Sequence, residues 1–363
     1  LTARQLTGSR SSTCALTIAE AVYCWGRRWG GVATSNLPLA VDINAGGGSG
    51  GPLAISYLQV SEDHGCLIQA SGVSNCTGNN DQGQLGDRSA SPFPSPTANT
   101  WPWVDVLRTF SNIKLGTSFS CGFHRYLTEA TTVPLVADSS QIPLCWGDGA
   151  SGQRGDSTTL NGAAQLASTP KHIKVKGLAA GIVFDSLSLA VGEKHACVVV
   201  AATSATGVGD AYCWGLNAHG QLGRATGAGN AARDSAAGKV AGVPALVRLY
   251  AGKYHTCGLT AAGATWCWGR NDYGQLGDGT RMAFNAGTST AVAVLTGVTF
   301  RSLTLGELFT CGVTGTPGTA VGASASAGTV YCWGDNTFGQ IGNAVAAGGN
   351  APVLSPTKVL YQP

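Results

Sequence analysis

Apolar and polar residues alternate over short stretches of this chain, and glycines interrupt almost every longer window. Segments such as NIKLG, LSLAVG, VRLYAG and RSLTLG are mostly apolar or alternating and end in glycine. Alternation over four to eight residues between turn residues is typical of β-strands, and the long windows lack the 3.6-residue period of an amphipathic helix. The pattern therefore predicts an all-β protein made of short strands.

The strand pattern recurs together with a cysteine motif. Six copies contain Cys24, Cys76, Cys145, Cys213, Cys267 and Cys332; five have Cys-Trp-Gly and five continue with Gly-Gln-x-Gly, as in WCWGRNDYGQLGDGT. A second cysteine precedes each copy, and a glycine or serine stands five residues before that cysteine. A motif that returns six times indicates one structural unit built six times over, not a single active site.

Four-stranded repeats that bury both faces stack radially into a propeller. We therefore predict a single β-propeller domain over 1–363, with six blades of about four antiparallel strands and, as the less favoured alternative, seven. The predicted blades are centred on 9–41, 58–97, 113–175, 187–247, 249–295 and 300–360. A C-terminal strand over 357–361 is expected to meet the N-terminal strands and close the ring.

The 12 cysteines fall two to a repeat. In three copies the spacing is ten residues, in two of them about a short turn that ends in glycine, and folding about such a turn would place the cysteines opposite each other on adjacent antiparallel strands. The alternative, metal binding by thiolates, lacks any C-x-x-C spacing. We predict one disulfide per blade: Cys14–Cys24, Cys66–Cys76, Cys121–Cys145, Cys197–Cys213, Cys257–Cys267 and Cys311–Cys332.

The combination of G-x-x-x-x-C, Tyr-Cys-Trp-Gly and Gly-Gln-Leu-Gly resembles the regulator of chromosome condensation repeat family over almost the whole chain. The resemblance implies a β-propeller, usually of seven blades, in which the motif tryptophan packs between blades and the glutamine ties a turn together. The tryptophans in this position are Trp25, Trp146, Trp214, Trp268 and Trp333. The second copy has Thr77 instead and should pack differently, and the first copy lacks Gln-Leu-Gly.

Composition and charge narrow the location and the partners. Six predicted disulfides, few charged residues (11%) and 53 glycines are typical of a secreted or cell-surface protein. A chain that starts at Leu1 also fits a mature form without its leader. The formal charge of +3, without a basic stripe, argues against nucleic acid, and no apolar run is long enough for a membrane span. Nothing in the sequence indicates a cofactor or a metal site.

Candidate chemical groups are few. His64, His195 and His255 stand two residues before a cysteine and could line a central channel, although local hydrogen bonding is the favoured interpretation. The aspartates that flank two Gly-Gln-Leu-Gly turns fit turn stabilisation better than calcium binding. The GGSGG stretch matches G-x-S-x-G formally but follows no strand. Asn75 in NCT is a weak glycosylation sequon, and Trp101 and Trp103 are a possible interface in a proline-rich insert.

Members of this family are functionally diverse, so the fold alone does not decide the function. Some promote nucleotide exchange on a small GTPase, one class senses ultraviolet light, and one secreted member inhibits β-lactamases. The cysteine framework argues against the first two. We predict a non-enzymatic extracellular interaction protein that self-assembles into a filament or surface layer. The alternative is a secreted monomeric inhibitor or adhesin that binds a protein or a glycan through one propeller face.

Overall fold

The chain has the predicted all-β, six-bladed propeller fold, seen in a computed structural model. The structure describes residues 2–9, 12–26, 35–41, 54–87, 109–125, 142–158, 167–177, 183–201, 208–226, 232–315, 317, 328–343 and 351–360. Residues 1–174 and 175–363 form two compact units, and each unit contains three blades. The predicted interface tryptophans Trp101 and Trp103 and the GGSGG stretch lie outside the described residues.

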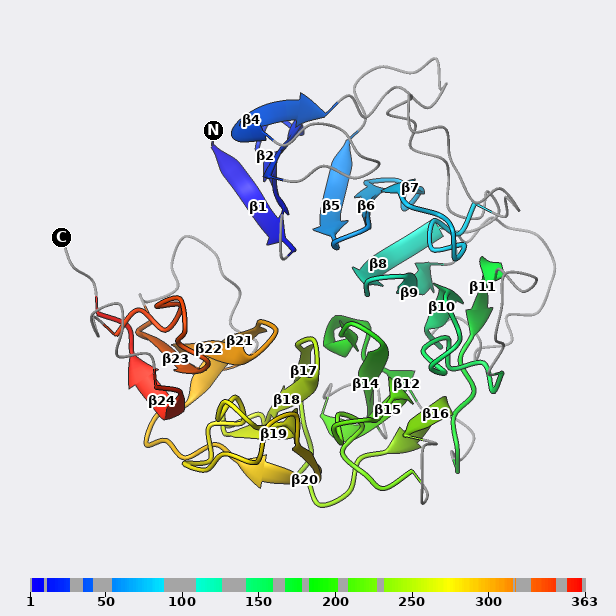
Figure 1. Cartoon of the computed structure of the whole chain (residues 1–363). Coiled ribbons are helices and arrows are strands. Elements are labelled where there is room, and N and C mark those ends of the chain that lie inside the picture. The colour runs from blue at the N-terminus through cyan, green and yellow to red at the C-terminus, as the bar shows by residue number, and fades with distance from the viewer. Residues whose placement is uncertain are drawn as a thin grey trace, which may run out of the picture. The chain divides into compact units, whose positions relative to one another are not determined.

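The first unit contains blades 1 to 3 (Figure 1). Adjacent strands within each blade are antiparallel, and the first strands of neighbouring blades, β1 with β5 and β5 with β8, contact each other. The strands are β1 (Ala3–Gly8), β2 (Ser12–Thr17), β3 (Val22–Gly26) and β4 (Ser35–Val41) in blade 1, β5 (Ile55–Val60), β6 (His64–Gln69) and β7 (Ser74–Gly78) in blade 2, and β8 (Thr109–Leu115), β9 (Phe119–Arg125), β10 (Leu144–Gly147) and β11 (Ala167–His172) in blade 3.

The second unit contains blades 4 to 6 (Figure 1). In blade 4 two short strands, β12 and β13, share the edge of β14 on either side of a 3-10 turn at Ser186–Ser188. The strands are β12 (Val183–Phe184), β13 (Ala190–Val191), β14 (His195–Ala201), β15 (Gly209–Leu216) and β16 (Arg233–Lys239) in blade 4, β17 (Arg248–Ala251), β18 (His255–Leu259), β19 (Thr265–Arg270) and β20 (Gly287–Ala293) in blade 5, and β21 (Phe300–Leu305), β22 (Phe309–Thr314), β23 (Val330–Gly334) and β24 (Val353–Lys358) in blade 6.

Each blade contains one disulfide, as the repeat predicts. The two cysteines are directly opposed in the antiparallel register, for example Cys257 opposite Cys267, with Cα atoms 4.1 Å apart in every pair. Longer inserts change only the tip of the hairpin, so the 24-residue separation of Cys121 and Cys145 gives the same register as a separation of ten.

The motif tryptophan and the disulfide lie on opposite faces of a blade. Trp268 belongs to the apolar cluster shared with Cys197 and Cys213 of blade 4, whereas the Cys257–Cys267 bridge of its own blade packs in the cluster that contains Trp333 of blade 6. This follows from alternation along β19, which sends adjacent side chains to opposite faces. In blades 4 and 5, the disulfide is thus covered by the indole of the next blade.

The interface between blades 1 and 2, where Thr77 replaces the tryptophan, packs differently, as predicted. Its buried cluster is aliphatic apart from the cysteines and includes Leu16, Ile55 and Leu58. Polar side chains of β1 add to it: Gln5 Nε2 donates to Leu58 O at 2.6 Å, and Thr7 Oγ1 accepts from the Val60 N–H at 3.2 Å. Side-chain-to-backbone hydrogen bonds therefore join blades 1 and 2 at the place where the motif tryptophan joins other pairs of blades.

The C-terminal strand β24 pairs with β23 inside blade 6. It ends at Lys358, so it overlaps only the start of the 357–361 segment for which ring closure is predicted. Closure on the N-terminal strands would join the two compact units, and it stays a prediction.

Candidate functional site

The Gly-Gln-Leu-Gly segment forms the same tight turn in each described copy. In blade 5, Gln275 Oε1 accepts from the Tyr273 N–H at 2.9 Å, and Asn271 Oδ1 accepts from the Leu276 N–H at 3.1 Å. Gly274 and Gly277 have positive φ values of 75° and 72°, which glycine adopts without steric strain. The glutamine thus ties the turn together through its side chain, and its own carbonyl oxygen stays available to a neighbour.

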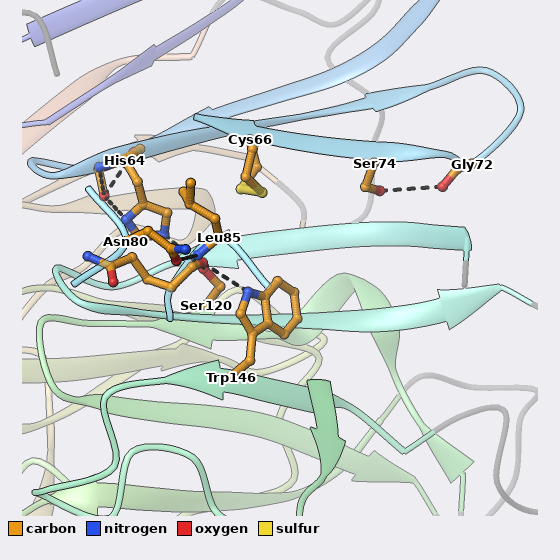
Figure 2. The surroundings of a disulfide bond; sticks show 11 residues. His64, Cys66, Gly72, Ser74, Asn80, Leu85, Ser120 and Trp146 are labelled. Carbon is orange, nitrogen blue, oxygen red and sulfur yellow. Dashed lines mark hydrogen bonds between the residues drawn. A yellow bond between two sulfur atoms is a disulfide. The ribbon is translucent and has the colours of Figure 1, made fainter. Parts of the chain in front are cut away.

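That carbonyl oxygen joins adjacent blades. Trp146 Nε1 of blade 3 donates to Gln84 O of blade 2 at 2.9 Å, and Ser120 Oγ donates to the same oxygen at 2.9 Å (Figure 2). His64 Nε2 of blade 2 lies 2.8 Å from Ser120 Oγ. One carbonyl, one hydroxyl, one imidazole and one indole therefore form a buried network between two blades, and we call it the His–Gln–Trp network.

The same network recurs twice in the second unit. Between blades 4 and 5 it consists of His195, Thr256, Gln221 and Trp268, and between blades 5 and 6 of His255, Thr310, Gln275 and Trp333. The distances from indole Nε1 to carbonyl oxygen are 2.9 and 3.0 Å. Three blade interfaces thus share one arrangement, which identifies it as a structural device of the repeat.

The hydrogen bonds fix the tautomer of each imidazole. Thr256 Oγ1 has a single hydrogen, and Gln221 O, an acceptor only, takes it at 3.0 Å. His195 Nε2, 2.9 Å from Thr256 Oγ1, must therefore donate, so the proton is on Nε2 and Nδ1 has a free lone pair. Nδ1 is buried and has no hydrogen-bond partner among the described residues.

Burial keeps these histidines neutral. His64, His195 and His255 are fully buried, and desolvation lowers the pKa of each from 6.5 to about 3. A neighbouring imidazole, His195, adds a small further lowering at His255. The side chains are therefore closed to water. Their Nε2 hydrogen bonds, expected to be local, reach across to the next blade, and His64 also has the expected local contact, Ser61 Oγ at 3.0 Å from Nδ1.

The turn glycines are held in contact with the indoles. A Cβ atom at Gly277 would lie 2.6 Å from Trp333 Nε1, whereas one at Gly242, which has nearly the same φ of 69°, would meet nothing within 4 Å. We expect Gly242→Ala to lower the free energy of unfolding by about 1–2 kcal/mol through backbone strain alone. Gly277→Ala should cost about 1–3 kcal/mol more because Trp333 cannot move aside.

Urea unfolding of the two variants, followed by tryptophan fluorescence, measures this difference. Equal losses in both variants would contradict a rigid indole at this turn.

A loop of blade 5 presents an aromatic side chain to solvent. Residues 281–286, here called the Phe284 loop, follow the blade 5 turn, and Phe284 is 83% exposed. Phe338, in the blade 6 turn, is 90% exposed. Scattered exposed apolar residues are ordinary, but these two are large aromatic rings on defined backbone, which is a feature of protein contact sites.

The Phe284 loop is fixed from below by polar contacts. Asn285, with a positive φ of 63°, donates its N–H to Asp272 Oδ2 at 2.8 Å and accepts from His219 Nδ1 at 3.0 Å. Arg270 pairs with Asp272 through two hydrogen bonds of 2.8 and 2.6 Å and lies under the Phe284 ring, 5.9 Å from its centroid. The backbone next to Phe284 is therefore fixed by polar contacts.

The charged side chains below the Phe284 loop, Arg270 and Asp272, are buried and paired. Burial alone raises the pKa of Asp272, but hydrogen bonds from the Arg270 guanidinium and the Asn285 N–H hold it below its usual value. Half-burial lowers the pKa of His219. Asp278 accepts hydrogen bonds from Thr280, as expected of a turn-stabilising aspartate. Sequence analysis missed this loop because no other copy of the repeat contains it.

The structure also shows the surroundings of the predicted glycosylation sequon and of the turn aspartates of blade 2. Asn75 of the sequon is 4% exposed, and its Oδ1 accepts from Gln69 Nε2 at 3.0 Å, so the folded chain does not present it as a glycosylation acceptor. Asp81 and Asp87 accept hydrogen bonds from Gln84 and Asn80 of their own turn. No helix among the described residues is long and apolar enough to cross a membrane.

Comparisons with known proteins identify the repeat. Residues 247–275 and 327–362 match the regulator of chromosome condensation (RCC1) repeat. The chain is a β-propeller that contains RCC1 repeats. This RCC1-repeat propeller is 26% identical over 366 residues to the E3 ubiquitin-protein ligase HERC2 of Homo sapiens, covering 96% of this chain but 6% of the ligase. HERC6 of Homo sapiens is 24% identical over 284 residues, which cover 77% of this chain and 23% of HERC6.

Solved structures agree on the fold of the RCC1-repeat propeller. Prp20p from Saccharomyces cerevisiae has a TM-score of 0.70 at 16% identity, covering 98% of this chain and 76% of Prp20p. Human WBSCR16 has a TM-score of 0.71 at 15% identity, covering 98% of this chain and 81% of WBSCR16. At these identities the likeness concerns the fold alone.

Proposed function

We propose that this RCC1-repeat propeller is a non-enzymatic protein-interaction module of an oxidising, extracellular compartment, and that the Phe284 loop is its main contact. The observation that carries the proposal is an aromatic ring, 83% exposed, on a loop that buried polar groups hold in one position. A preorganised anchor costs little conformational entropy on binding, which is what a partner with an apolar pocket requires.

Two further observations support the proposal. Prp20p is a structural neighbour studied for its binding to Gsp1p and histones, and yeast RCC1 (Prp20) has been solved bound to Kap60. Those partners are proteins, which favours protein binding for this chain too. The six disulfides favour an oxidising compartment, where such bonds persist.

Non-enzymatic action is favoured by the histidines described above. An imidazole whose pKa is about 3, and whose Nε2 donates to a buried hydroxyl, is a poor general base near neutral pH. The groups of the His–Gln–Trp network are also closed to solvent, so a substrate could not reach them.

Photocrosslinking tests the proposed contact. With p-benzoylphenylalanine in place of Phe284, the chain in its native setting should form a discrete crosslinked protein species. The matched control is the same replacement at Leu187, which is 67% exposed on blade 4 and lies outside the Phe284 loop. Crosslinking at 284 but not at 187 supports the proposal, and equal or absent crosslinking at both positions contradicts it.

Mass spectrometry of the crosslinked species separates the two forms of the proposal. A dimer of this chain indicates the self-assembly that the sequence analysis favours, and sedimentation at high concentration should then detect larger species. A heterologous partner, with a monodisperse monomer in sedimentation, indicates the secreted binder instead.

A further inference from the structure

The fourth strands of the blades differ in how their outer edges are protected. A fourth strand pairs with its own sheet on one side only, so its other edge presents N–H and C=O groups on which a further strand can form. Proline, which has no N–H, and charged side chains prevent such pairing. In β4, β11 and β24 a proline stands immediately before the residue that pairs with the second cysteine of the blade: Pro38, Pro170 and Pro356.

The fourth strand of blade 4 is protected by charges and by a neighbouring segment. β16 contains Arg233, Asp234 and Lys239. Ala237 stands at the position of the prolines, and its carbonyl oxygen accepts from the Lys176 N–H at 2.9 Å. The backbone at this position therefore points outward, away from the sheet, and in β16 it already has a partner.

β20, the fourth strand of blade 5, has none of these protections. Its sequence, GTSTAVA, contains neither proline nor a charged residue, and Ala291 occupies the position of the prolines. In the part of the chain that the structure describes, no bridge or backbone hydrogen bond reaches its outer edge. Blade 5 contacts blades 4 and 6 of its own unit, and β20 is its outermost strand (Figure 1). The register shift within β20 occurs in all five described fourth strands, so it does not protect β20 in particular.

Exposed apolar side chains flank β20 at both ends. Phe284, three residues before the strand, is 83% exposed, and Leu295, two residues after it, is 64% exposed. In an antiparallel pair of identical strands, the start of each strand lies beside the end of the other. A second copy of this chain therefore brings the Phe284 end of one β20 to the Leu295 end of the other, which no unrelated strand is bound to do.

We propose that the outer edge of β20 is a dimerisation surface, on which β20 of a second copy adds as an antiparallel strand. The proposal rests on the proposed function in its use of Phe284 as a contact, and it names a second copy as the partner. Full overlap of the strands places residues of small, uncharged side chains opposite each other: Gly287 and Ala293, Thr288 and Val292, Ser289 and Ala291, and Thr290 and Thr290. No charge opposes the contact, and main-chain hydrogen bonds supply it.

A contact of this kind has a defined stoichiometry. A two-fold contact uses the same surface on both copies and therefore closes at two. Pairing through β20 yields a dimer, and a filament requires a second, different contact.

Proline at position 291 tests the pairing. Ala291→Pro introduces the residue that three other fourth strands hold at this position, so the chain should fold, and it removes an N–H from the edge in both copies. Sedimentation at high concentration should detect a dimer of the unmodified chain, and Ala291→Pro should raise its Kd by about tenfold or more. Hydrogen exchange of the amides in Gly287–Ala293 should slow as the concentration rises, and it should not do so in the variant.

Charge at the two-fold axis tests the register. Thr290 is exposed and meets Thr290 of the other copy, so Thr290→Lys and Thr290→Glu should each weaken the dimer several-fold, and a mixture of the two variants should restore it. The matched control is Ser355→Lys, at the same register position of β24, which contains Pro356. It should leave the dimer unchanged.

The outcomes separate this proposal from the proposed function. A chain that stays monomeric at high concentration, or a dimer that Ala291→Pro and Thr290→Lys leave intact, overturns pairing through β20. A monomeric chain that crosslinks from position 284 to a different protein overturns the pairing but keeps the proposed function. A dimer that both variants dissociate, without crosslinking from position 284, supports the pairing and contradicts Phe284 as the main contact.

Discussion

Reduction of all six disulfides is expected to unfold the chain at room temperature. The bridges close segments of 10 to 24 residues, and each contributes roughly 3 kcal/mol by restricting the unfolded chain. Together they contribute about 18 kcal/mol, which exceeds the roughly 5–15 kcal/mol by which folded domains are usually stable. The reduced chain should therefore lose its far-ultraviolet β signal and its buried indole fluorescence.

Because the cysteine sulfurs are buried, the reduction experiment must begin from the unfolded chain. Most of the cysteines are 0–1% exposed, so a reductant reaches them only when a blade opens. The chain is therefore reduced in denaturant, its thiols are held reduced, and the denaturant is removed. The control passes through the same steps without reductant. A reduced chain that regains the melting transition of the control would contradict a decisive role of the bridges.

A single bridge provides the graded version of this prediction. Replacing Cys257 and Cys267 together with alanine should lower the free energy of unfolding by about 3 kcal/mol, with some further loss from the cavity. The Cys66 and Cys76 pair, with the same separation of ten residues, provides a matched second site. Similar losses at the two sites would support the chain-entropy account, since the neighbours of these bridges differ.

The blades and their bridges could be predicted because they depend on local spacing. A ten-residue separation about a short turn fixes the register of a hairpin in three copies, and one cysteine pair in each of six repeats leaves little freedom of pairing. Adjacent Cys267 and Trp268 must also point to opposite faces of β19. Such inferences need only neighbouring residues, which is why they hold across copies with inserts of different length.

Contacts between blades were harder to predict from the sequence. His64 and Ser120 are 56 residues apart, and nothing local indicates that they meet. A signal was present nevertheless, because each copy with a histidine is followed by one with serine or threonine at the next cysteine. The Phe284 loop had no such signal, since its anchor depends on Arg270, Asp272 and His219 in two blades, and no other copy repeats it.

Mild acid is expected to destabilise the chain through its buried histidines. The folded pKa of His64, His195 and His255 is about 3, against 6.5 in the unfolded chain. Below pH 6.5 the unfolded state binds protons that the folded state does not, so stability is complete above 6.5 and is lost as the pH falls. Each of these histidines should lower the free energy of unfolding by about 1.4 kcal/mol per pH unit, or about 8 kcal/mol for the three by roughly pH 4.5.

A variant isolates the contribution of one imidazole. His255→Gln keeps a donor for Thr310 Oγ1 but removes the titrating group, so the variant should be less stable near pH 7 and lose about 1.4 kcal/mol less per pH unit below 6. The two stability curves, measured by urea unfolding from about pH 7 to 4.5, should therefore converge. Asp234 and Asp272, whose pKa values are lowered, release their contributions only at lower pH.

His219 provides the control because it is half-buried and lies outside the network. Burial lowers its pKa, but half of the imidazole stays in contact with water, so His219→Gln should change the pH dependence less than His255→Gln does. Parallel curves for His255→Gln and the unmodified chain would mean that the imidazole takes up its proton in the folded state. A folded protein would then have to admit water to Nδ1 between blades 5 and 6, which the close packing of Gly252 against that ring opposes.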